Sequence, residues 1–310
     1  MSRRRGGLSR VAGKDAPIAA SPARLHRIER GLELCWLALA LLTPSLFNPA
    51  SLRVFEAEKV AFVRAVALLM AALWAAELLL GSKARYADDV SGGAGRASWI
   101  DRLRAFPFLL PVAALMGCYL LAALLSDLPQ VSLMGSYRRQ FGAATHLSCA
   151  VVFLAAAAHL RTPARGRRLV LAIALGASIP SLYALIQRFG LDPIPWGIDN
   201  SRRVVGTLGQ PTFLGAYLAA AIPSTVWLVL GAGARRARFG LALLLAIQLL
   251  ALLFSQSRAA WLGAAVGGSL VLLRSDPGRR LVGRIGLRRL ALAGAAALTL
   301  LVAINLPGSG

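Results

Sequence analysis

The sequence Phe254-Ser255-Gln256-Ser257-Arg258-Ala259-Ala260-Trp261 joins two apolar runs, residues 239–254 and 259–273. Each run is too long and too uniformly apolar for an amphipathic helix on the surface of a soluble protein. The link between them holds three polar residues and one arginine, which leaves no room for a long loop. An arginine at a membrane edge is costly unless it reaches water or an anion. The stretch therefore predicts two membrane-spanning helices with a specific role for Arg258 at their junction.

The composition of the whole chain is typical of a polytopic membrane protein. Of its 310 residues, 57% are hydrophobic and only 15% are charged, which leaves too little polar surface for a soluble domain of this size. The formal net charge of +22 would indicate a nucleic-acid partner in a soluble protein. Here the basic residues fall in short links between apolar runs, so the positive-inside rule explains them and we expect no nucleic-acid partner.

The fold predicted from these runs is all-α, a polytopic helical transmembrane bundle. A hydrocarbon core about 30 Å thick needs about 20 apolar residues in a helix, and by that measure the chain has about nine spans. The predicted spans are residues 31–47, 60–80, 105–125, 141–160, 169–187, 212–230, 239–254, 258–273 and 289–306.

The positions of lysine and arginine orient this bundle. With a cytoplasmic N-terminus, 26 of the 35 Lys and Arg residues fall on cytoplasmic segments, which predicts that orientation. An odd number of spans then places the C-terminus on the outer face, the periplasm of a bacterium. We divide the chain into a basic cytoplasmic segment (1–30), a transmembrane bundle (31–306) and the start of an outer segment (307–310). Segment 81–104 contains a Ser-Gly-Gly run and is predicted to be a flexible cytoplasmic loop.

The outer link 188–211 is long for a connection between spans and leads into Gly206-Thr-Leu-Gly-Gln-Pro-Thr-Phe-Leu-Gly-Ala-Tyr217. Pro211 fits the first turn of a helix, and Thr212 can cap nearby amides. Exposed amides at a helix N-terminus, preceded by glycines and by Arg202 and Arg203, form a natural anion site. A glycine-rich turn with interfacial anchors is the alternative interpretation, and spacing alone does not decide between them.

A second outer link has a similar pattern. Gly135-Ser-Tyr-Arg-Arg-Gln-Phe-Gly142 opens the fourth span, and Arg138 and Arg139 could bind lipid phosphate or face water. Arg64 lies near the outer end of its span, where a structural role is expected. For His146 we expect helix packing with one nitrogen hydrogen-bonded, and for Glu33 and Glu77 pairing with nearby basic residues.

The cysteines give no sign of a redox or metal function. Cys35, Cys118 and Cys149 each lie inside an apolar run, so we expect buried thiols that act as small hydrophobic groups. Their odd number and unpaired spacing argue against a disulfide framework and against a metal site.

Several segments together resemble the bacterial O-antigen ligase family. Ser257-Arg258-Ala-Ala-Trp-Leu-Gly263 resembles its T-x-S-R-G-A-W-L-G segment, and residues 206–218 resemble its G-T-x-G-N-P-N-F-L-G-A-Y-L segment. Residues 135–142 are similar to its G-S-Y-E-R-Q-x-G segment, and Phe55-Glu-Ala-Glu-Lys-Val60 is similar to a weaker lysine motif. The resemblance covers residues 31–270. Gln210 and Thr212 stand where the family usually has asparagine, and Arg138 stands where it often has glutamate.

The resemblance implies an enzyme of the bacterial inner membrane, a glycosyltransferase of lipopolysaccharide biosynthesis. Such enzymes transfer a glycan from undecaprenyl diphosphate to a lipid or protein acceptor at the periplasmic face, with no metal and no cofactor. Matching by motif gives a donor-diphosphate site and a structural motif. The diphosphate site would comprise Arg258, Arg203, Arg202, Arg139 and Arg138, and the structural motif Ser257, Gly206, Gly209, Gln210, Pro211 and Tyr217.

The chemistry of these residue types suits such a reaction. Fixed arginines neutralise a diphosphate leaving group through paired, charge-assisted hydrogen bonds, and a water-poor membrane edge strengthens that stabilisation. In the family a large periplasmic loop, which carries the histidine that is the usual candidate base, would begin at Gly310. We therefore expect the chain to be a fragment, a truncated homologue or half of a split protein. On this interpretation the chain alone lacks ligase activity. An O-antigen polymerase shares these motifs, and a transporter with an arginine-lined path or a non-catalytic membrane scaffold are the alternatives from other classes.

Overall fold

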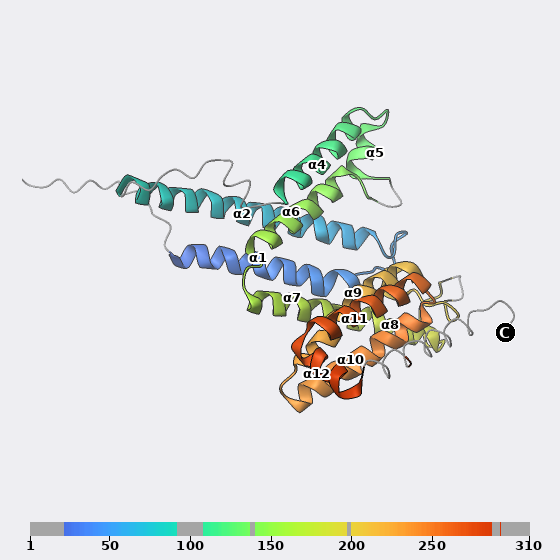
Figure 1. Ribbon diagram of the computed structural model, residues 1–310. Helices are drawn as coiled ribbons and strands as arrows, with labels where there is room; N and C mark the ends of the chain where they lie inside the picture. Colours follow the sequence, from blue (N-terminus) through green and yellow to red (C-terminus); the bar gives the residue numbers. More distant parts are fainter. Residues whose placement is uncertain (1–21, 92–107, 137–139, 197–199, 287–291, 293–310) are drawn as a thin grey trace, which may run out of the picture.

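The computed structural model describes residues 22–91, 108–136, 140–196, 200–286 and Leu292, and every regular element in these ranges is a helix (Figure 1). The all-α prediction is therefore confirmed for the described part of the chain. The elements are α1 (Pro22–Leu42), η1 (Thr43–Ser45), α2 (Ala57–Ser91), α4 (Leu109–Leu124), α5 (Pro129–Met134), α6 (Ala143–His159), α7 (Pro163–Gly176), α8 (Ser178–Arg188), η2 (Gly206–Leu208), α9 (Pro211–Gly231), α10 (Arg235–Phe254), α11 (Arg258–Arg274) and α12 (Asp276–Ile285).

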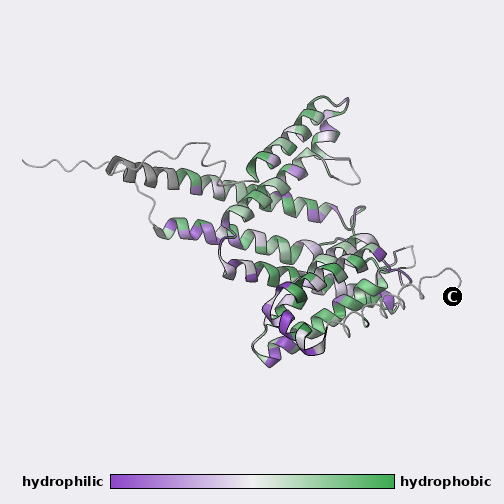
Figure 2. Ribbon diagram, viewed as in Figure 1, coloured by the Kyte–Doolittle hydropathy of each residue, from purple (hydrophilic) through white to green (hydrophobic). Residues whose placement is uncertain are grey.

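Four helical segments are long and apolar enough to cross a membrane. They are Ala57–Leu80, Pro163–Arg188, Pro211–Gly231 and Arg235–Phe254, and at most 39% of the most apolar stretch in each is buried inside the protein. The remaining apolar side chains form an exposed hydrophobic surface, in which Leu68 and Phe239 are each 72% exposed. Figure 2 shows hydrophobic residues along the lengths of these helices and hydrophilic residues at the starts of α1 and α10. Because an aqueous surface rarely carries so much apolar area, these features indicate a membrane protein.

Prolines explain where two predicted spans are interrupted. The span predicted at 169–187 is divided into α7 and α8, since Pro180 has no N–H to donate to the carbonyl of Gly176. The span predicted at 31–47 already leaves the α-helix at Leu42, and Pro44 follows in the short 3₁₀ turn η1, because a proline disfavours the α conformation of the residue before it.

Two other expectations were wrong in part. The predicted loop 81–104 begins as helix, since α2 continues to Ser91, and residues 92–107 lie outside the described residues. Only Cys35 is buried, whereas Cys118 and Cys149 are exposed on the apolar surface. Apolar periodicity could not separate these positions, because a lipid-facing side and a buried side of a membrane helix have the same composition. The span predicted at 289–306 lies almost wholly outside the described residues.

The helices pack into two hydrophobic cores. One core lies among α8, α9, α10 and α11, where the fully buried side chains include Leu214 and Leu218. The other joins α1, α2 and α6 around Leu32, Trp36 and Met70. Helix α7 contacts both α1 and α9, and so connects the two cores. In Figure 1, α4 and α5 extend from the side of α2 and α6, apart from α9 and α11.

Candidate functional site

The first turns of α9 and α11 are packed directly against each other, which brings together two of the segments singled out in the sequence. A Cβ atom added to Gly215 would lie 2.7 Å from the Cβ of Ser257 and 2.8 Å from the Cβ of Ala260. Both distances are far below a normal contact, so only glycine allows this approach. Gly215 therefore sets the position of the Ser257-Arg258 junction relative to α9.

The junction between α10 and α11 is a tight turn held by its own side chains. The Ser255 hydroxyl is buried and donates to the Leu252 carbonyl at 2.7 Å, and the Trp261 indole donates to the same carbonyl at 3.0 Å. Gln256 takes a positive φ of 50°, a strained conformation for this residue. Helix α11 then begins at Arg258, which is exposed.

Residues 200–205, part of the link between α8 and α9, run alongside this turn. The Val204 amide donates to the Phe254 carbonyl at 3.3 Å, and the Arg203 Nε donates to the Ser255 carbonyl at 3.2 Å. Arg203 is thus anchored to the same short turn that precedes Arg258. Arg202, its exposed neighbour, lies on the same link. The structure therefore brings together Arg203 and Arg258, two of the five arginines expected to bind a donor.

Sequence reasoning missed a further arginine at this place. The guanidinium carbon of Arg188, in the last turn of α8, lies 5.0 Å from the centre of the Phe254 ring, a cation–π contact. Its Nη1 also donates to the Ser201 carbonyl at 2.8 Å. Arg188 lies at the boundary of a predicted span and matches no motif, so only its place at the end of a helix could have indicated it. We call Arg188, Arg203 and Arg258, with the turn at residues 254–258, the arginine site.

The arginine site is strongly cationic. Among the residues that the structure describes, the ion pairs involve none of Arg188, Arg202 and Arg203. The N-terminal amides of α11 add the positive end of a helix dipole at the same position. This arrangement of planar guanidinium groups around one turn is chemically suited to bind an anion with several oxygens.

The glycine-rich turn before α9 is fixed by contacts from two other elements. The side-chain oxygen of Gln187, which is 1% exposed, accepts hydrogen bonds from the amides of Val205 (3.1 Å) and Gly206 (2.8 Å). The buried Thr207 hydroxyl donates to the Pro44 carbonyl at 2.7 Å. These bonds hold η2 between α8 and η1.

The two glycines of this turn have conformational and steric reasons to be glycine. Gly206 and Gly209 have φ values of +56° and +75°, which residues with a side chain rarely adopt. A Cβ at Gly209 would also lie 2.3 Å from a ring carbon of Phe55. Both glycines are therefore needed for the conformation and packing of the turn.

The remaining residues of the expected structural motif lie at the start of α9 and in its second turn. Gln210 is the N-cap, with an extended backbone and no side-chain cap bond, and Pro211 occupies the first turn as expected. The expectation that Thr212 caps the helix was wrong, since it already lies inside it. Tyr217 donates to the Ile173 carbonyl at 3.3 Å, so it connects α9 with α7.

The lysine of the weaker motif is a structural residue. Lys59 Nζ donates to the carbonyls of Leu46 (2.5 Å), Phe55 (2.8 Å) and Thr207 (2.8 Å). An ammonium group has three N–H donors, and all three are used here. Lys59 therefore fastens the start of α2 to η2, and it has no donor left for a phosphate.

The start of the link after α8 is organised by Asp192. Its carboxylate accepts hydrogen bonds from the Tyr183 hydroxyl (2.9 Å), the Trp196 indole (2.7 Å) and the Ile194 amide (3.0 Å). Burial alone would raise the pKa of Asp192, but these donors outweigh it and hold the pKa below its usual range. Trp196 in turn stacks on Phe55 with ring centres 5.0 Å apart. Through Trp196, Asp192 therefore connects this link to residues 55–60, the segment that contains Lys59.

The third resembling segment, residues 135–142, lies elsewhere. Arg138 and Arg139 are outside the described residues, and the flanking parts of the segment are held by Arg64 of α2. Its guanidinium donates to the carbonyls of Met134 (2.8 Å) and Gln140 (3.0 Å) and to the Thr145 hydroxyl (2.7 Å). The structural role expected of Arg64 is confirmed. In Figure 1 this part of the chain is separated from α9 and α11, so the described residues of the segment do not join the arginine site.

His146 is also structural, as expected. Its Nδ1 lies 2.9 Å from the Gly142 carbonyl, and its ring stacks on Tyr119 with ring centres 4.2 Å apart. It therefore contributes to the packing of α4 against α6.

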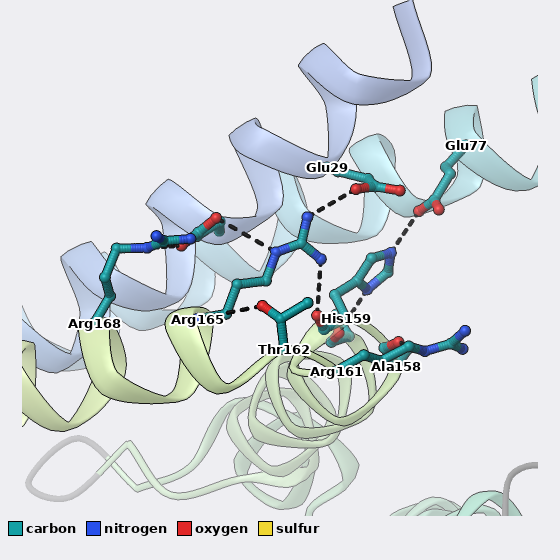
Figure 3. Close-up of polar contacts among 10 residues, drawn as sticks. Glu29, Glu77, Ala158, His159, Arg161, Thr162, Arg165 and Arg168 are labelled. Carbon is teal, nitrogen blue, oxygen red and sulfur yellow. Dashed lines mark hydrogen bonds and ion pairs between the residues drawn. The ribbon is translucent and has the colours of Figure 1, made fainter. Parts of the chain in front are cut away.

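A second polar cluster lies at the opposite ends of α1, α2 and α7 (Figure 3). Glu33 binds Arg168 at 2.5 Å and Arg165 at 3.6 Å, Arg165 also binds Glu29 at 2.8 Å, and His159 contacts Glu77 at 2.6 Å. The expected pairing of Glu33 and Glu77 with basic residues is confirmed. Because each carboxylate of this cluster contacts an arginine or histidine of another helix, we assign the cluster to the anchoring of α1, α2, α6 and α7 to one another.

Comparison of the chain with protein-family models, with curated proteins and with solved structures finds no match.

Proposed function

We propose that this chain is the donor-binding membrane part of a glycosyltransferase that resembles the O-antigen ligases. It would take a glycan linked to undecaprenyl diphosphate at the periplasmic face of a bacterial inner membrane and serve its transfer to a lipid or protein acceptor. The observation that carries this proposal is the grouping of Arg188, Arg203 and Arg258 around the turn at residues 254–258.

The electrostatics of the arginine site favour a diphosphate over a single charge. Guanidinium groups pair with phosphate oxygens in a planar, two-bonded geometry, and a diphosphate offers oxygens to more than one arginine at once. Charge that develops on the departing diphosphate would be stabilised by groups already fixed by the protein, which is the largest contribution to catalysis in many enzymes. The anchoring of Arg203 to the Ser255 carbonyl supports such pre-organisation.

The proposed topology has nine spans, a cytoplasmic N-terminus and a periplasmic C-terminus. The separation of the two polar clusters supports it. Lys59 at the start of α2 contacts η2, whereas Glu77 lies in the same span toward the cluster that holds Arg165 and Arg168. Basic residues near the second cluster agree with a cytoplasmic end, so the arginine site would face the periplasm.

Binding to undecaprenyl diphosphate tests the proposal. The full chain would be reconstituted in lipid nanodiscs, and its affinity for undecaprenyl diphosphate compared between the wild type and Arg258→Ala. Loss of one charge-assisted contact should weaken binding by about 10- to 100-fold. The matched control is Arg274→Ala, at the last residue of the same helix, which should bind as the wild type does. Equal affinities of the wild type and Arg258→Ala for undecaprenyl diphosphate would contradict the proposal.

A further inference from the structure

A polar cavity of about 450 Å³ lies between the loop before α2 and the N-terminus of α9. The loop before α2 lines one wall, with Arg53, Phe55 and Glu56, and the start of α9 lines the other, with Gln210 and Phe213. Its volume lies in the range of roughly 300–1,000 Å³ that is usual for small-molecule sites. None of the three arginines of the arginine site lines this cavity.

The groups that line the cavity suit a polyhydroxylated, uncharged ligand. Within the described ranges, neither the Glu56 carboxylate nor the Gln210 side-chain amide has a hydrogen-bond partner. A carboxylate accepts two hydrogen bonds side by side, and an amide both donates and accepts, as vicinal hydroxyl groups require. Arg53 and Glu56 bring opposite charges to the lining, so the cavity does not favour an anion as the arginine site does.

The aromatic part of the lining fits the other face of a sugar. Phe213 is 54% exposed at the first turn of α9, an expensive position for an aromatic ring in water. A pyranose has an apolar face of C–H groups, which can cover such a ring while its hydroxyls bond to the opposite wall. The opposite wall of the cavity is held in place at Phe55, whose ring stacks on Trp196 and packs against Gly209.

The positions of the cavity and the arginine site on α9 are related by helix geometry. Gln210 lines the cavity, while Gly215 contacts Ser257 beside the arginines. At 100° and 1.5 Å per residue, these positions are separated by about 8 Å along the axis and face different sides of the helix. A glycan extending from a diphosphate at the arginines would therefore cross the N-terminal end of α9 to reach the cavity.

We propose that this cavity, lined by Arg53, Glu56, Gln210 and Phe213, is a saccharide subsite that binds sugars of the donor glycan beyond the diphosphate. The inference rests on the proposed function, which it extends from the diphosphate to the sugars. The subsite would make the affinity for the donor depend on its glycan, which the arginine site alone would not.

The experiment compares two probes, undecaprenyl diphosphate and undecaprenyl diphosphate that carries a neutral trisaccharide, on the full chain in nanodiscs. We expect the wild type to bind the glycan-bearing probe about tenfold more tightly or better, since several hydrogen bonds are added. Glu56→Ala and Phe213→Ala should lose that gain and keep the wild-type affinity for the sugar-free probe, which also shows that they fold. Arg274→Ala serves as the control that keeps both affinities.

Other outcomes overturn the inference or its premise. Equal binding of both probes by the wild type, or a gain that persists in Glu56→Ala and Phe213→Ala, would show that the cavity is not a saccharide subsite. If the wild type binds neither probe, the proposed function fails. The cavity is then tested alone with the soluble trisaccharide at millimolar concentration, by hydrogen exchange of residues 52–56 and 208–213. Protection of both segments supports a saccharide subsite, and its absence overturns it.

Discussion

Gly215 on α9 and Ser257 before α11 are in such close contact that a Cβ on the glycine would lie 2.7 Å from the Cβ of the serine. This contact joins residues 206–218 and 257–263, two of the segments singled out in the sequence. It also places the start of α11, with Arg258, beside the link that carries Arg203.

Substitution at Gly215 should therefore loosen the whole site. We expect Gly215→Ala to lower the free energy of unfolding by about 1–3 kcal/mol, because the added methyl group overpacks the α9–α11 contact. Unfolding in detergent micelles measures the effect. Gly231→Ala is the matched control, since no atom lies within 4 Å of its added Cβ at the end of the same helix. Identical unfolding midpoints for the two variants would contradict the packing described above.

Lys59 should matter for stability and not for ligand affinity. Replacement by methionine keeps much of the apolar stem but removes three hydrogen bonds to carbonyl groups. We expect a loss of about 1–3 kcal/mol in the free energy of unfolding. The folded fraction should bind undecaprenyl diphosphate with wild-type affinity. If Lys59→Met instead weakened binding while leaving stability unchanged, Lys59 would be a ligand-binding residue.

Asp192 should make stability depend on pH in the acidic range. Its hydrogen-bond donors lower the pKa in the folded protein, so the folded state binds fewer protons than the unfolded state. The resulting stabilisation is present above the ordinary aspartate pKa of about 4 and is lost as the pH falls through the folded-state pKa. We expect the difference in unfolding midpoint between the wild type and Asp192→Asn to shrink from pH 6 to pH 3. A constant difference over that interval would show that the charged form is not the favoured one.

The second polar cluster provides a test of anchoring at the opposite end. Glu33 is 8% exposed and contacts two arginines, whereas Glu29 is more exposed and contacts one. Glu33→Gln should lower the free energy of unfolding by about 1–3 kcal/mol, because Arg168 loses its counter-charge and Arg165 loses one of two. Glu29→Gln, whose pair is near water, should cost about 0–1 kcal/mol. The reverse order, measured by unfolding in micelles, would contradict the assignment.

The helices themselves were predictable from the sequence because long apolar runs have one solution in a bilayer. Residues 212–230 and 239–254 correspond closely to α9 and α10. The break at Pro180 and the early end of α1 were not predicted, since hydropathy averages over a window and does not register one missing N–H. The extension of α2 to Ser91 was missed because a polar stretch was read as a loop.

Site residues that belong to a sequence motif could be predicted, whereas those that join the site only through the packing of the helices could not. Arg203 and Arg258 could be named from sequence, but their common turn depends on the small residue Gly215, which permits the close approach. Arg188 and Gln187 act through the end of α8, and no spacing in the sequence links them to residues 201–206 or to Phe254. The role of Lys59 was likewise invisible, because its partners are carbonyl groups far apart in the chain.

The most direct test of the arginine site compares undecaprenyl diphosphate with undecaprenol, which has the same chain and no charge. Affinities for both would be measured for the wild type, Arg203→Ala, Arg258→Ala and the double variant in nanodiscs. We predict that the wild type prefers the diphosphate and that each single substitution reduces this preference by about 10- to 100-fold. The affinity for undecaprenol should stay unchanged throughout. A wild type that does not distinguish the two lipids, or a preference that survives in the double variant, would contradict a diphosphate site at Arg203 and Arg258.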